Sequence, residues 1–148
     1  MHKSRRLRAL LVSTALVVLC AASAIAQPVA TPEDLRRLTE QIMDKVDSGD
    51  VDDAFRLLRP RTIIGESEFD ALAAQAKLQV ALVGQKFGGN LGHELIRQDR
   101  VGESLVRYVY LDKFDRYALR WVFYGYKGKG GWIIHTFRLD DQLPAIFP

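Results

Sequence analysis

His135 offers the clearest capacity for catalysis in this sequence. It lies in an alternating run, in phase with Ile133 and Phe137, so it shares their face of a predicted strand. If that face lines a cavity, the imidazole can act as a general base. The sequence identifies no partner for His135, so an ordinary core or surface histidine remains the alternative.

Arg107 is the second candidate. It interrupts an aliphatic strand face formed by Leu105, Val109 and Leu111. Inside a cavity its guanidinium would bind an anionic ligand through two parallel hydrogen bonds. The alternative is a solvent-facing strand on which the arginine stem covers its aliphatic neighbours.

Aromatic residues are concentrated in the same predicted strands. They could line a pocket for a flat apolar ligand or form a dimer face, with core packing as the alternative. The candidate ligand-binding residues are Arg107, Tyr108, Tyr110, Trp121, Tyr124 and His135. Arg107 and Tyr108 are adjacent in a strand, so they must point to opposite sides of the sheet. A buried tyrosine hydroxyl will need a hydrogen-bond partner.

Other chemistries are disfavoured. Beyond residue 26 the chain has only two histidines, His93 and His135, and no cysteine, so we expect no metal site and no cofactor. The glycine-rich run 127–131 precedes a strand and lacks a phosphate-binding pattern. Carboxylates such as Asp112 lie at strand ends, where solvated acids belong.

Residues 1–26 read as a cleaved export signal. A basic start is followed by an apolar run and by small residues that place cleavage after Ala26. We therefore expect a periplasmic or secreted protein with no membrane span after cleavage. Cys20 could be a lipidation site, but the bulky Leu19 before it disfavours that.

The remaining 122 residues suit a single domain over residues 32–148, preceded by a short leader at 27–31. Residues 1–26 hold four of the 21 Lys and Arg and none of the 18 Asp and Glu, which leaves 17 basic residues against 18 acidic ones. This near-neutral balance disfavours nucleic-acid binding.

Helix signals dominate the first half. Thr31 and Pro32 are typical of a helix start. Apolar residues then recur at steps of three and four: Leu35, Leu38, Ile42 and Val46. A second helix over 51–58 stops before Pro60. A third, over 68–86, begins with a predicted capping box at 67–70 and is apolar on more than one side, so we expect it to be covered on both.

Strand signals dominate the second half, after the glycines at 88–92. Four strands are predicted over 93–99, 105–112, 116–126 and 132–139, with a hairpin turn at 128–131. Short connections require antiparallel neighbours. The fold class is therefore α+β, with N-terminal helices packed on a curved four-stranded antiparallel sheet.

The chain resembles the NTF2-like superfamily in two segments. Residues 48–60, SGDVDDAFRLLRP, look like its tight turn and second helix ending in proline, and residues 131–135, GWIIH, are similar to its closing strand. The resemblance implies a cone-shaped fold with a hollow, and dimerisation through the sheet. The superfamily includes isomerases, dehydratases, hydrolases, ligand carriers and interaction domains, and no catalytic position carries over to this sequence.

We therefore expect an exported binding or interaction module without catalytic activity, which takes a small apolar or anionic ligand. One alternative is an isomerase-like or dehydratase-like enzyme, with His135 as base and Arg107 or a tyrosine polarising the substrate. Another is a structural subunit of an envelope assembly that docks a partner through the exposed strand edge or the apolar tail at 143–148.

Overall fold

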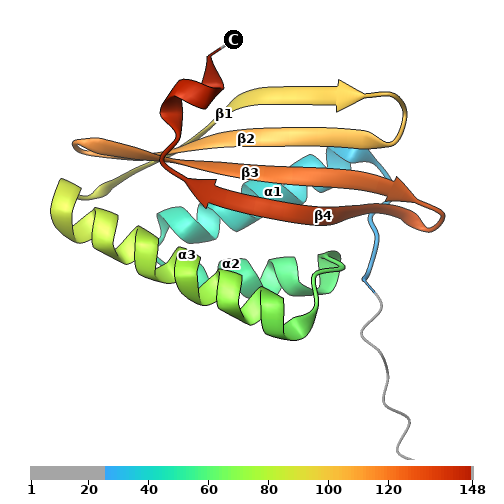
Figure 1. The fold of residues 1–148 in the computed structure, drawn as a ribbon, viewed down its shortest axis with the longest axis horizontal. Helices are drawn as coiled ribbons and strands as arrows, with labels where there is room; N and C mark the ends of the chain where they lie inside the picture. The colour runs from blue at the N-terminus through green and yellow to red at the C-terminus, as the bar shows by residue number, and fades with distance from the viewer. Residues whose placement is uncertain (1–25, 148) are drawn as a thin grey trace, which may run out of the picture.

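The computed structural model describes residues 26–147, so the predicted signal peptide lies outside the described residues except for Ala26. Three helices precede a four-stranded sheet (Figure 1). The elements are α1 (Pro32–Asp47), α2 (Val51–Leu58), η1 (Arg59–Arg61), α3 (Glu66–Phe87), β1 (Asn90–Val101), β2 (Leu105–Phe114), β3 (Tyr117–Gly128), β4 (Gly131–Asp140) and η2 (Leu143–Ile146). The α+β class and the predicted element order are confirmed.

Helix α1 begins where its sequence predicts. The Thr31 hydroxyl accepts a hydrogen bond from the Asp34 amide at 3.0 Å, and the Thr31 amide donates to the Asp34 carboxylate at 3.1 Å. This reciprocal capping box satisfies two backbone amides that the helix itself cannot. The predicted apolar face of α1 is buried against the sheet.

Helix α3 departs from prediction at its start and on its outer side. It begins at Glu66 after Gly65, with no capping side chain, so the capping box predicted at 67–70 is wrong. Leu78 and Leu82 are 61% and 54% exposed, so the described residues cover α3 on one side only. No helix among residues 26–147 is both long and apolar enough to cross a membrane.

The sheet is antiparallel in the order β1-β2-β3-β4, so each hairpin joins neighbours and β4 is an edge strand. The predicted leader is attached to that edge, because Val29 exchanges two backbone hydrogen bonds of 2.8 Å with Trp132. Thr62 forms a second bridge, to Ile134. The three helices lie along one side of the sheet and η2 lies on the other (Figure 1).

Aromatic packing fills the space between helices and sheet. Phe55 of α2 contacts Phe69 of α3 and Phe137 of β4 at ring-centroid distances of 5.9 and 5.6 Å. Trp121 lies 6.3 Å from the same Phe55 ring. The expected hollow at this position is therefore a packed core.

Candidate functional site

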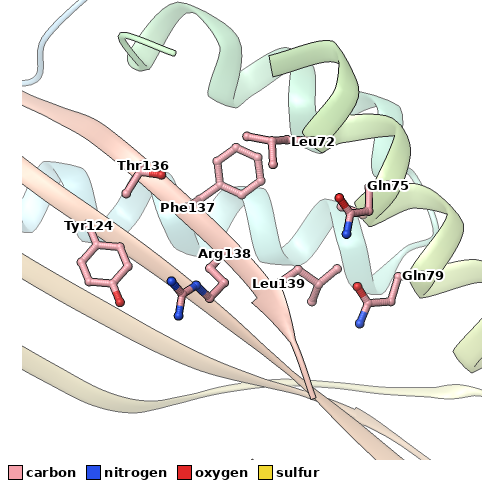
Figure 2. A pocket seen from close by; sticks show the side chains of 9 residues that line it. Leu72, Gln75, Gln79, Tyr124, Thr136, Phe137, Arg138 and Leu139 are labelled. Atoms are coloured by element: carbon pink, nitrogen blue, oxygen red, sulfur yellow. The ribbon is translucent and has the colours of Figure 1, made fainter. Parts of the chain in front are cut away.

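A groove opens between α3 and the edge strand β4, with a volume of about 270 Å³. Its position follows from the topology, because β4 has no further strand beside it and α3 runs along that edge (Figure 2). The lining residues are Leu72, Gln75, Ala76, Gln79, Tyr124, Thr136, Phe137, Arg138 and Leu139. The four α3 residues of this set follow one another at steps of three, one and three positions, which places them on one face of the helix.

The groove combines an apolar surface with hydrogen-bond donors. Leu72, Phe137 and Leu139 supply the apolar part, and the side-chain amides of Gln75 and Gln79 face β4 from α3 (Figure 2). Arg138 adds a guanidinium that makes no ion pair with any of residues 26–147. A few convergent polar groups around an apolar wall are typical of small-molecule sites.

Three of the six residues predicted to bind ligand lie in the core instead. Tyr108, Tyr110 and Trp121 are each 0% exposed. The Tyr108 hydroxyl donates to the Pro32 carbonyl at 2.5 Å, and the Tyr110 hydroxyl bonds to Thr39 Oγ1 at 2.7 Å. Both hydroxyls therefore have partners, as expected, and neither ring offers surface to a ligand in this structure.

Arg107 lies on the opposite face of the sheet from Tyr108, as strand alternation requires. Its Nε and Nη2 donate to Asp99 Oδ2 at 2.8 and 2.6 Å. That pair occupies the guanidinium, and Arg107 lines two hollows on the outer sheet face together with Tyr124, so its predicted role in ligand binding stays a prediction. Tyr124 shares this outer face and also contributes to the α3–β4 groove, so it is the one predicted ligand residue that lines it.

His135 does not face an enclosed cavity, which corrects the expectation for the candidate base. Tyr124 pairs with Thr136 and Gly125 pairs with Ile134, so His135 is the unpaired residue of a β-bulge. The bulge breaks the alternation on which its predicted phase depended. His135 is exposed, and its ring lies against Tyr126, which is itself 43% exposed.

A buried carboxyl group lies on the helix-facing side, where the sequence predicted a solvated one. Asp112 is 0% exposed. It accepts hydrogen bonds from Asn90 Nδ2 at 2.6 Å and from Trp121 Nε1 at 3.3 Å. Burial raises the pKa of Asp112 to about 6, although these two hydrogen bonds act in the opposite direction.

A histidine–carboxylate pair lies close to Asp112. His93 Nδ1 is 2.6 Å from Asp47 Oδ2, and Asp44 from the same helix end joins this cluster. The strand register shifts between Asn90 and His93, where Gly92 adopts a φ of +92°. This irregularity places His93 against the end of α1. Counting only histidines and cysteines missed the cluster, because its other members are carboxylates.

Three helices followed by an open four-stranded antiparallel sheet match the NTF2-like arrangement. No family model and no curated protein matches the chain. Among solved structures, the chain is similar to a Campylobacter jejuni protein provisionally named an NTF2-like transpeptidase, with 14% identity, a TM-score of 0.47 and coverage of 72% of this chain and 99% of that chain. The element order and sheet topology agree with the fold that the NTF2-like resemblance implies, and the name of the Campylobacter jejuni protein assigns no activity to this one.

Proposed function

We propose that this protein is an exported binding module without catalytic activity and that the α3–β4 groove holds a small amphipathic anion. The observation that carries the proposal is Arg138. Arg107 and Arg120, which share the outer sheet face, each donate two hydrogen bonds to an aspartate. Arg138 makes no such pair within the described chain and borders an apolar wall, so its guanidinium is available to a ligand carboxylate.

The ligand class follows from the size and lining of the groove. A volume of about 270 Å³ is close to the lower end of the range for ligand pockets, about 300 Å³. An aromatic or short aliphatic carboxylate would place its apolar part against Leu72 and Phe137 and its charge beside Arg138. Gln75 and Gln79 can donate further hydrogen bonds from the opposite wall.

The test is a nuclear magnetic resonance titration of the chain lacking residues 1–26, with benzoate and octanoate as anionic probes and benzamide as the neutral one. We expect both carboxylates to shift the side-chain amide signals of Gln75 and Gln79. Arg138→Gln should weaken carboxylate binding by at least about tenfold, the value of one charged hydrogen bond. Benzamide should bind more weakly and respond little to the substitution.

Arg37→Gln is the matched control. It removes the same charge from α1, where the Arg37 side chain is 65% exposed. If Arg37→Gln and Arg138→Gln weaken carboxylate binding equally, the effect arises from net charge alone, which would contradict the proposed site. The absence of any shift in the groove with either carboxylate would also contradict it.

The two alternative functions have less support. The enzyme alternative placed His135 in a cavity, and His135 is exposed at a bulge. The envelope-subunit alternative expected an exposed apolar patch in the tail. Phe147 is 73% exposed, but Ile146 is half-buried and its carbonyl accepts a hydrogen bond from Arg97 at 3.2 Å, so within residues 143–147 Phe147 is the one large hydrophobic side chain that is exposed.

A further inference from the structure

Three potential metal ligands meet where the end of α1 approaches the start of β1. The ligand atoms of Asp44, Asp47 and His93 all lie within 4.8 Å of one another. We infer that these side chains form a binding site for a divalent first-row transition-metal ion. The site is separate from the α3–β4 groove and does not depend on the function proposed for it.

One oxygen of the cluster lacks a partner. The Asp47 side chain is 22% exposed, but its Oδ1 atom is buried and accepts no hydrogen bond from the described residues, whereas Oδ2 of the same carboxylate contacts His93 Nδ1 at 2.6 Å. A buried polar atom without a partner costs free energy comparable to a lost hydrogen bond, more when the group is charged. A cation bound by this carboxylate would remove that cost.

The cluster also carries an excess of negative charge, which favours a bound cation. Asp44 and Asp47 belong to the last turn of α1, where the helix dipole is negative and carboxylates are disfavoured. Asp44 makes no ion pair within residues 26–147, and Lys45 of the same turn pairs with Asp53 at 3.8 Å. Asp112 adds a further carboxyl group that interacts electrostatically with Asp47. Within residues 26–147, His93 is the one ion-pair partner of Asp47.

The local backbone and packing hold the ligands in place. The Gly92 amide donates to Asn90 Oδ1 at 2.6 Å, which fixes the irregular start of β1 just before His93. The His93 ring meets the Tyr110 ring edge-on, at 5.6 Å between centroids. An imidazole held in one orientation loses little freedom when it binds a metal, as in built metal sites.

The donor set favours a particular class of ion. Imidazole suits zinc, iron, nickel and copper, whereas magnesium and calcium prefer oxygen-only sites. The 2.6 Å between His93 Nδ1 and Asp47 Oδ2 is close to the spacing, roughly 3 Å, of neighbouring donors bonded to one ion at about 2.0–2.1 Å. Two carboxylates and one imidazole therefore predict Zn²⁺ or a similar ion, with water completing the coordination.

The test is isothermal titration calorimetry of the chain without residues 1–26, stripped with a chelator and titrated with Zn²⁺ or Mg²⁺. We expect one Zn²⁺ per chain and Mg²⁺ binding at least about tenfold weaker. Asp47→Asn and His93→Gln should each weaken Zn²⁺ binding by about tenfold or more. His135→Gln is the matched control, because it removes the other histidine of this shortened chain and should leave Zn²⁺ affinity unchanged.

A second variant keeps the test decisive if the substitutions at the partly buried Asp47 and His93 disturb folding. Asp44 is exposed, so Asp44→Asn should fold normally by circular dichroism and still lose Zn²⁺ affinity. Zn²⁺ should raise the thermal unfolding midpoint of the wild type and of His135→Gln more than that of Asp44→Asn. The inference fails if no saturable Zn²⁺ binding occurs, if a folded Asp44→Asn binds as the wild type does, if His135→Gln abolishes binding, or if Mg²⁺ binds equally well.

Discussion

Asp112 shows how a single side chain can depart from its sequence-based expectation and still follow the rules of strand geometry. It continues the phase of Tyr108 and Tyr110 along β2, so all three face the helices. Its position near the end of the predicted strand suggested that the carboxyl group is exposed to solvent. In the structure β2 continues to Phe114 and the carboxyl group is buried. Alternation alone could have placed Asp112 inside, whereas its partners Asn90 and Trp121 come from other strands and could not be predicted.

Burial makes the stability of the fold depend on pH. The folded-state pKa of Asp112 is about 6, above the ordinary value of 3.8, so the folded protein holds this proton more tightly than the unfolded chain. Its contribution is fully present below pH 3.8 and is lost as the pH rises through about 6. A shift of this size corresponds to about 2–3 kcal/mol in the free energy of unfolding.

Asp112→Asn tests this prediction, because the amide keeps the shape of the side chain but cannot ionise. The variant should be less stable at pH 4, since its amide group meets a donor from Trp121 or Asn90. The stability advantage of the wild type should then shrink by about 2–3 kcal/mol between pH 4 and pH 7. Urea unfolding of both proteins across this range, in the presence of a chelator, measures it. A constant difference would contradict the assigned pKa.

At the scale of elements, two irregular strands decide where the two histidines of the folded domain lie. The shift beside Gly92 in β1 brings His93 to the end of α1, and the bulge in β4 exposes His135. A period of two residues predicts faces correctly only while the ladder is regular. The strand signals in the sequence therefore predicted the sheet, but they did not predict where either histidine side chain lies.

Gly92→Ala should disturb the start of β1. Gly92 has a φ of +92°, which residues with a Cβ rarely adopt, so we expect a loss of about 1–3 kcal/mol in stability. The signals of His93 should also shift in nuclear magnetic resonance spectra as the ring moves relative to Asp47. Gly89→Ala is the control, because a Cβ there meets nothing within 4 Å and its φ is outside the positive range. Equal destabilisation by both substitutions would contradict a role for the positive φ.

The cap of α1 provides a second test at this scale. Thr31→Ala removes the hydroxyl that accepts from the Asp34 amide, and should destabilise the protein by about 1 kcal/mol. Thr31→Ser keeps the hydroxyl and should recover most of that loss. Chemical denaturation of the three proteins measures the effect. If the serine variant is as unstable as the alanine variant, the capping hydrogen bond is not the cause.

At the scale of the whole molecule, local patterns were informative and long-range contacts were not. The spacing of Leu35, Leu38 and Ile42 predicted the buried face of α1, and short connections predicted an antiparallel sheet. Asp47 and His93 are separated by 46 positions, and their contact depends on how α1 crosses the sheet. The α3–β4 groove likewise joins residues from distant segments whose proximity no local pattern encodes.

Export is a property of the whole chain and can be tested directly. We predict that the protein isolated from an envelope fraction begins at Gln27, because the small residues 24–26 precede that position. Intact-mass measurement should give the mass of residues 27–148. Ala26→Lys should block cleavage and leave the precursor in place, whereas Gln27→Ala should be processed normally. Recovery of the uncleaved wild-type chain from the soluble cytosol would contradict the prediction.

The attachment of Val29 to Trp132 also bears on how recombinant versions should be designed. The two reciprocal hydrogen bonds occupy backbone groups of an outermost strand that would otherwise accept a strand from another molecule. A truncation starting at Thr31 would uncover them while leaving every predicted helix and strand intact. Such a shortened protein should keep its circular dichroism spectrum yet self-associate at high concentration, so expression boundaries are best set at Gln27.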